Sequence, residues 1–238
     1  MQWRRFTHLF GEMLQTLPLA FTLALIGFTA TIAQIVLLRE LLVISYGNEM
    51  SLGVMLASWL LWTAFGSAIL GRVTIRFSNP ALMLATSQLA LGLLFPVTIL
   101  AVRAGRGLFH AMPGELLGPI PVFLACLLTL SCFCTASGWA FVAGTRLYEQ
   151  EVRSSAPTAL NSVYLLEAVG SAVGGILTSF ILLRYLNTLQ IAGFVSLLNM
   201  IAATVIVLRR RRHAAVTTLI LLAAWLLVGL PEGRRWEI

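Results

Sequence analysis

The sequence predicts an all-α membrane protein, a polytopic bundle of about seven transmembrane helices. Of its 238 residues, 59% are hydrophobic and only 11% are charged, against roughly 25% charged residues in soluble domains. The mean hydropathy is +0.92. A soluble fold of this size cannot bury so much apolar surface. The third observation is that the apolar residues gather in long uninterrupted runs.

Seven of these runs are long enough, or nearly so, to cross a bilayer core of about 30 Å. Helices are expected because a lipid-exposed backbone must satisfy its own hydrogen bonds. The alternating pattern of barrel strands is not seen. The last run is the shortest. The runs are residues 18–38, 52–70, 81–102, 120–144, 158–183, 188–208 and 214–230.

The segments flanking the bundle (17–230) have a different character. Residues 1–16 lack the small-residue cleavage site of a signal peptide. Their apolar side chains recur at helical spacing, which predicts a short amphipathic helix lying in the membrane interface. Residues 231–238 (PEGRRWEI) are polar and carry a tryptophan. We expect them to begin a linker to a soluble domain that this chain does not contain.

The basic residues predict the orientation. All 16 are arginine and they lie at the ends of the apolar runs, where cations meet lipid headgroups. With seven spans, ten arginines fall on the side of the N-terminus and six on the other side. This predicts a multi-pass plasma (inner) membrane protein with a cytoplasmic N-terminus. The net charge of +7 is thus explained by lipid contacts, and nucleic acid is not an expected partner.

Several classes of chemistry are excluded by composition. The chain contains no lysine and no aspartate, so it has no P-loop lysine, no Schiff-base lysine and no aspartate-centred triad. Its three cysteines lie in one apolar run at a spacing that fits no zinc site. We expect no catalytic residue, no metal site and no cofactor in this chain.

A sequence similarity between two segments of the chain predicts that the bundle contains structural repeats. Residues 64–71 (AFGSAILG) and 168–175 (AVGSAVGG) match at five of eight positions, 104 residues apart. The two predicted helices run in opposite directions, as in inverted three-helix repeats. Chance recurrence of small residues in membrane helices is the alternative. Small residues let helix backbones approach closely, so we predict packing roles for Ser67, Gly71, Gly170, Ser171, Gly174 and Gly175.

Glu167 is the main candidate for a functional residue, because it lies nine residues into the fifth run. A carboxylate at that depth needs a partner or water. Tyr164 precedes it by three residues, and the small residues Gly170, Ser171 and Gly174 follow it at helical spacing, which predicts that Glu167 faces another helix. It is then either a proton, cation or substrate site, or a protonated group that joins two helices by a hydrogen bond.

A second polar cluster is predicted where the first run ends. Gln34, Arg39 and Glu40 close that run, and Asn48 and Glu49 follow in the turn. Together they are candidates for contacting a substrate at one side of the membrane. The alternative is interface anchoring with a surface ion pair.

Two stretches carry a resemblance to a family. GFTATIAQIVLLRELLVISYGNEMSLGVMLASWLLWTAFGSAILGR resembles the first two helices of membrane-bound spermidine synthase-like proteins, and NSVYLLEAVGSAVGGILTSFILLRYLN is similar to one of their later helices. The resemblance implies a membrane domain that anchors a soluble aminopropyltransferase-type domain, in cis or in trans, and feeds or senses its substrate. That domain uses aspartates, so no catalytic residue carries over and any enzyme activity belongs to a longer parent.

Two other functions stay open. Gly66, Gly71, Arg72 and Arg76 resemble the glycine-and-arginine loop of major facilitator transporters, although the acidic residue of that pattern is missing. This predicts half of a small-molecule or cation transporter. A structural subunit of a membrane complex is the third interpretation. Self-association is open, and so is the side of the C-terminus, because seven spans place it outside whereas the donor of aminopropyl groups is cytoplasmic.

Overall fold

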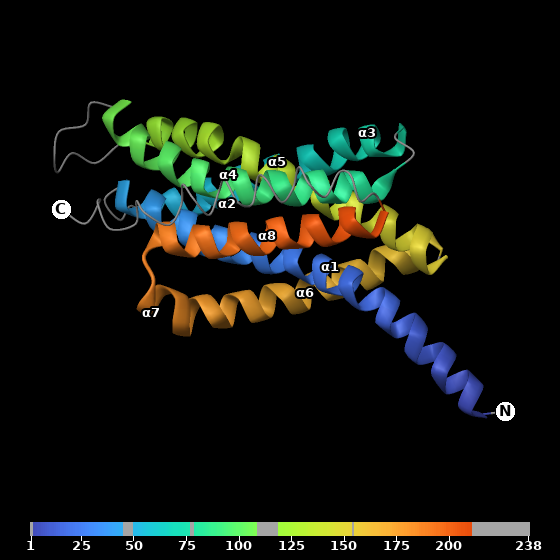
Figure 1. Cartoon of the computed structure of the whole chain (residues 1–238). Helices are drawn as coiled ribbons and strands as arrows, with labels where there is room; N and C mark the ends of the chain where they lie inside the picture. Colours follow the sequence, from blue (N-terminus) through green and yellow to red (C-terminus); the bar gives the residue numbers. More distant parts are fainter. Residues whose placement is uncertain (1, 45–49, 77–78, 109–118, 154, 211–238) are drawn as a thin grey trace.

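The computed structural model describes residues 2–44, 50–76, 79–108, 119–153 and 155–210, and all regular structure in these ranges is helical (Figure 1). Six helical segments are long and apolar enough to cross a membrane. The chain is therefore a multi-pass membrane protein, as predicted. The spans are Leu17–Val43, Leu52–Thr74, Pro80–Gly105, Ile120–Val152, Ala156–Tyr185 and Thr188–Leu208.

These six spans correspond to the first six predicted runs. The predicted seventh run, 214–230, and the predicted linker, 231–238, lie outside the described residues. The bundle as described thus has six spans rather than seven. An even number of spans puts Leu17 and Leu208 on the same side of the membrane.

Helix α1 (Gln2–Ile44) contains both the predicted interfacial segment and the first span. It continues from residue 2 to residue 44 with Pro18 inside, so no turn separates the two. The hydroxyl of Thr22 donates to the Pro18 carbonyl at 2.8 Å. The first part of α1 projects beyond the other helices (Figure 1). That residues 1–16 lie in the membrane interface stays a prediction.

Two of the spans contain a π-helical turn. The second span consists of α2 (Met50–Phe65), the π-turn Gly66–Leu70 and α3 (Gly71–Arg76). The fifth consists of α6 (Ala156–Leu177), the π-turn Thr178–Leu182 and α7 (Leu183–Tyr185). Such turns insert an extra residue into an α-helix and are frequent at functional sites. The remaining spans are α4 (Pro80–Leu108), α5 (Pro119–Val152) and α8 (Thr188–Arg210).

A tight hairpin joins α7 to α8. The backbone N–H of Asn187 donates to Oε1 of Gln190 at 3.1 Å, and the backbone N–H of Gln190 donates to Oδ1 of Asn187 at 3.1 Å. This reciprocal pair satisfies N–H groups that the first turn of a helix leaves free. It explains why two residues suffice to reverse the chain.

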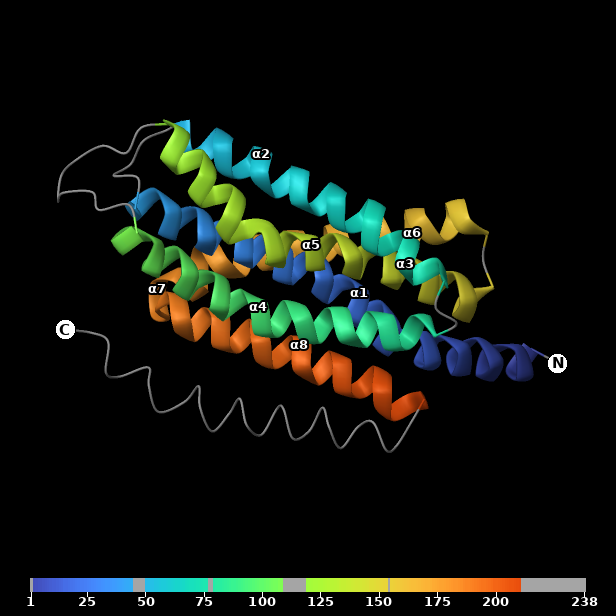
Figure 2. The same cartoon turned by 90° about the horizontal axis from the view of Figure 1, so that it is seen from above.

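Each helix packs on particular neighbours. Helix α1 packs along α6, α2 along α5, and α4 between α5 and α8; Figure 2 shows the α2/α5 and α4/α8 pairs side by side. From the order of the spans, α1 and α6 run in the same direction, and so do α2 and α5. We call the side where α1 enters the membrane at Leu17 the proximal side and the other the distal side.

The buried side chains lie mainly on α1, α4, α5 and α8. Phe95 of α4 and Phe133 of α5 are fully buried, with ring centroids 5.6 Å apart. Helices α2 and α6 are peripheral, and their outer faces carry exposed apolar side chains such as Leu60 and Leu165. Exposed leucine and phenylalanine suit lipid, which takes the place of water around these faces.

Candidate functional site

Glu167 is the twelfth residue of α6 and lies against α1. A Cβ added to Gly27 of α1 would overlap the Glu167 carbonyl oxygen and lie 2.7 Å from the Glu167 Cγ. The backbone and side-chain stem of Glu167 therefore rest directly on a glycine. We call this contact line between α1 and α6 the α1/α6 crossing.

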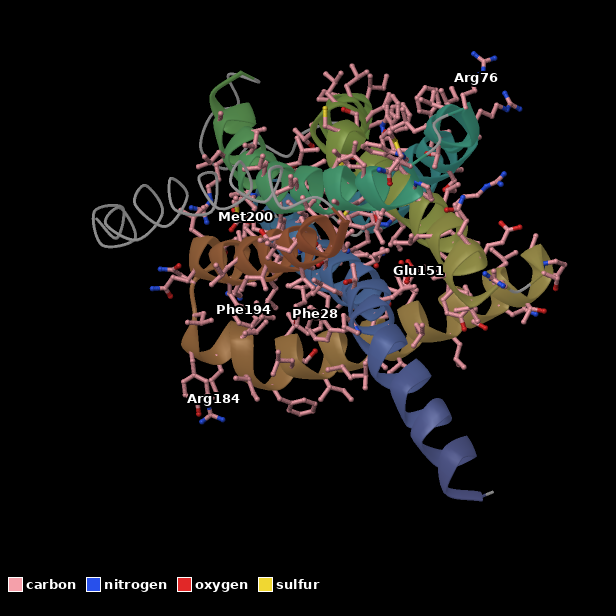
Figure 3. The ribbon with its side chains drawn as sticks, turned by 45° about the vertical axis from the view of Figure 1, so that its right-hand side comes forward. Phe28, Arg76, Glu151, Arg184, Phe194 and Met200 are labelled. Carbon is pink, nitrogen blue, oxygen red and sulfur yellow. The ribbon has the colours of Figure 1, made fainter. Side chains whose placement is uncertain are left out.

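The small residues that follow Glu167 continue along the crossing. Gly170 packs on the carbonyl of Ala24, and a Cβ on Gly174 would lie 2.9 Å from the Phe28 carbonyl oxygen. Two side chains also lie in the crossing. The Ser171 hydroxyl would lie 2.7 Å from a Cβ on Gly27, and a Cβ on Gly175 would lie 3.6 Å from Thr31 Cγ2. Figure 3 labels Phe28 on the side of α1 that faces α6.

The carboxyl group of Glu167 is half-buried within a membrane span. Within the part of the chain that the structure describes, it has no hydrogen-bond or ion-pair partner. The residue opposite, Gly27, has no side chain to offer one. A role as interhelical glue would need such a partner, so the geometry favours the other interpretation, a group available to a ligand or a proton.

Tyr164 does not join Glu167 in the crossing. It is 67% exposed and lies on the outer surface of α6. Gln34 follows Gly27 by seven residues, about two turns, so it lies on the same side of α1 and is half-buried. Of the polar residues predicted around Glu167, Ser171 is the one that the structure brings nearest.

The predicted cluster at the end of the first span is not one site. Glu40 accepts two hydrogen bonds from Arg103 of α4, Nε to Oε2 at 3.0 Å and Nη2 to Oε1 at 2.8 Å. Thr188, the first residue of α8, lies beside the same carboxylate. Arg39 is exposed. Asn48 and Glu49 lie outside the described residues, so the ion pair of Glu40 with Arg103 replaces the predicted cluster.

A second crossing, between α2 and α5, contains the other predicted packing residues. Gly66 packs on the Thr135 carbonyl, and Gly138 of α5 packs on the Thr63 carbonyl. The hydroxyl of Ser67 donates to the carbonyls of Thr63 at 2.9 Å and Gly138 at 3.2 Å. A further contact lies one turn on, where a Cβ on Gly71 would be 3.2 Å from Val142 Cγ1.

Sequence reasoning missed Gly27, Gly138 and Arg103. Gly27 and Gly138 are isolated glycines without a second glycine, alanine or serine four positions away that would mark a packing stripe. Arg103 is 63 residues from its partner Glu40, a separation that no local pattern encodes. The reciprocal contacts of two glycines across each crossing are visible only in three dimensions.

The described residues contain no group of three or more His, Cys, Asp or Glu side chains that could hold a metal ion. In comparisons with known proteins, no family model, no curated protein and no solved structure matches this chain. The case for its function therefore depends on the bundle and on Glu167.

Proposed function

We propose that this chain is the membrane-embedded unit of a spermidine synthase-like protein, that it holds an aminopropyltransferase-type domain at the bilayer in cis or in trans, and that it binds a polyamine-like cation at Glu167. The observation that carries the proposal is the carboxyl group of Glu167 inside a membrane span, which has no partner among the described residues. An ammonium group supplies both the charge and the hydrogen bonds that this carboxyl group lacks.

The bundle consists of two inverted three-helix repeats in this proposal. The support is that the two crossings correspond residue by residue. Thr63 of α2 and Gly66 of the π-turn that follows α2 correspond to Glu167 and Gly170 of α6, 104 residues later. On the partner helices the shift is 111 residues, from Ala24 to Thr135 and from Gly27 to Gly138. In both crossings each glycine packs on a backbone carbonyl of the other helix.

The N-terminus is cytoplasmic in this proposal, and the membrane is the plasma (inner) membrane. The support is the distribution of arginine over the described residues, eight on the proximal side and four on the distal side. Positive charge favours the cytoplasmic side. The proximal arginines are Arg4, Arg5, Arg72, Arg76, Arg146, Arg153, Arg209 and Arg210, and the distal ones are Arg39, Arg103, Arg106 and Arg184.

A small-molecule or cation transporter of major-facilitator type is the second candidate. The correspondence of the two crossings favours it, because secondary transporters are commonly built from inverted repeats with the substrate site near the middle of the bilayer. Binding without transport supports the first proposal, whereas uptake of the amine supports the second. A purely structural subunit would do neither.

Equilibrium binding of radiolabelled spermidine to the purified chain in nanodiscs tests the proposal. We expect saturable binding by the wild type and at least about tenfold weaker binding by Glu167→Gln, because the substitution removes a charge-assisted hydrogen bond. The matched control is Glu149→Gln, since Glu149 lies near the end of α5 and approaches Arg146 at 4.0 Å. Equal binding by the wild type and Glu167→Gln, or none by the wild type, would refute the role of Glu167.

The same protein in proteoliposomes distinguishes the two candidates. The first proposal expects no time-dependent spermidine uptake above protein-free vesicles. Uptake that Glu167→Gln abolishes and Glu149→Gln preserves would favour the transporter.

A further inference from the structure

Two amide side chains are fully buried where α1, α4 and α8 meet. Gln88 of α4 and Asn199 of α8 both have a relative exposure of 0%. Nε2 of Gln88 donates to the carbonyl of Thr22 at 3.2 Å. Nδ2 of Asn199 donates to Oγ1 of Thr29 at 2.8 Å and to the carbonyl of Val195 at 2.8 Å. Both amides thus bind α1 through their NH₂ groups.

The oxygen of each amide has no donor. Oε1 of Gln88 and Oδ1 of Asn199 are buried and unpaired across the described ranges, from residue 2 to residue 210 with their gaps. Turning either amide over does not help, because its oxygen would then face the carbonyl of Thr22 or Val195. Two unpaired acceptors in a bilayer core are costly, so each calls for a hydrogen-bond donor.

A small cavity lies at the proximal end of the same interface. It has a volume of about 30 Å³ and is open to the outside, which is room for a water molecule. Ala81 of α4 and Ile206 of α8 line it, each seven residues, about two turns, from one of the two amides. Glu151 of α5 forms a polar part of the wall (Figure 3). The cavity thus lies at the proximal end of the helices that carry Gln88 and Asn199, about two turns from each amide.

The distal end of this interface is closed. The ion pair between Glu40 and Arg103 joins α1 to α4 there. Between that pair and the amides, α4 contributes Phe95 and Ile99, both with 0% exposure. On the proximal side Leu84 and Ala203 are likewise fully buried, and the cavity is the feature that favours entry from there.

We propose that water enters the α1–α4–α8 interface from the cavity beside Glu151 and donates hydrogen bonds to Oε1 of Gln88 and Oδ1 of Asn199. The site takes a small neutral donor because both acceptors are uncharged amides, which leave a bound cation without compensating charge in the bilayer core. The site is separate from Glu167, which lies on the side of α1 that faces α6.

Cysteine accessibility tests the proposal in a background with Cys126, Cys132 and Cys134 replaced by serine. A thiol reacts with methanethiosulfonate-ethylammonium only where water can ionise it. We expect Gln88→Cys to react at least about tenfold faster than Leu91→Cys, a buried control three residues along α4. Reaction should require reagent on the proximal side of sealed vesicles. Equal, slow reaction of both variants, or faster reaction from the distal side, would overturn the proposal.

A map of the unsubstituted chain in nanodiscs gives a reading that does not depend on how the variants fold. At a resolution that shows ordered water elsewhere in the bundle, we expect density within hydrogen-bonding distance of both amide oxygens. Clear maps without such density would overturn the proposal. So would a density peak enclosed by a cage of oxygen ligands, because that would identify a cation.

Discussion

The α1/α6 and α2/α5 crossings solve the same packing problem with one chemical difference. In each crossing, both helices contribute a glycine, and each glycine rests on a backbone carbonyl of the opposite helix. In the α2/α5 crossing, Thr63 stands three residues before Gly66. In the α1/α6 crossing, Glu167 stands three residues before Gly170. Since a threonine serves this position in α2, the architecture requires only its backbone carbonyl. The carboxyl group of Glu167 is therefore more than the packing of the helices needs, which is the reason to assign it to a ligand.

The largest expected effect comes from the glycines that the two crossings share. Gly66→Ala and Gly170→Ala place a Cβ on the backbone of Thr135 and Ala24, which cannot move aside as a side chain can. We expect each to lower the free energy of unfolding by about 3 kcal/mol or more, as overpacking does at its upper range. Unfolding in mixed micelles measures it.

Gly53→Ala is the matched control, because nothing lies within 4 Å of a Cβ at that position of α2. We expect it to be neutral or to stabilise the chain by up to about 1 kcal/mol through helix propensity. If Gly66→Ala and Gly170→Ala behave like Gly53→Ala, the two close crossings do not exist as described.

The next effect distinguishes the two crossings. Thr63→Glu places a carboxylate where the Thr63 hydroxyl is buried and has no hydrogen-bond partner in the described part of the chain. We expect it to destabilise the chain by about 2–3 kcal/mol, the cost of a charged side chain at the centre of a membrane helix. Thr63→Gln, measured in the same way, separates the charge from the added size. A Thr63→Glu chain as stable as the wild type would mean that the α2/α5 crossing tolerates a carboxylate. The carboxyl group of Glu167 would then be no reason to assign that residue to a ligand.

The smallest effect concerns two serines 104 residues apart. The hydroxyl of Ser67 donates across its crossing to the carbonyl of Gly138, whereas the hydroxyl of Ser171 forms no hydrogen bond within the described helices. We expect Ser67→Ala to cost about 0.6 kcal/mol, a typical value for a hydrogen bond between membrane helices, and Ser171→Ala to cost nothing measurable. Unfolding of the two variants side by side checks this, and a larger loss for Ser171→Ala would reverse the assignment.

The sequence predicts much of this fold because bilayer thickness and backbone hydrogen bonding leave few choices. Each of the six described spans covers a predicted apolar run, and the small residues around Gly170 indicate a close helix contact. The partner helices were not predictable. Gly27 and Gly138 are single glycines in apolar runs, and nothing local states that they meet Glu167 and Thr63.

The candidate site was predictable only in part for a related reason. A glutamate inside an apolar run is conspicuous in any membrane sequence, so Glu167 could be found. Glu40, by contrast, was grouped with its neighbours in sequence, while its actual partner Arg103 comes from another helix. Polar groups near the ends of spans have several helix ends within reach, and sequence order does not choose among them.

The central claim is that the carboxyl group of Glu167 serves a ligand and not the fold. Glu167→Thr tests it most directly, because it gives the α1/α6 crossing the residue that the α2/α5 crossing already has. Unfolding and spermidine binding are measured on the same preparation. We predict a free energy of unfolding no lower than that of the wild type, because the substitution removes a costly carboxyl group from a membrane span, together with loss of saturable spermidine binding. A variant that unfolds markedly more easily, or that still binds spermidine like the wild type, would contradict the claim.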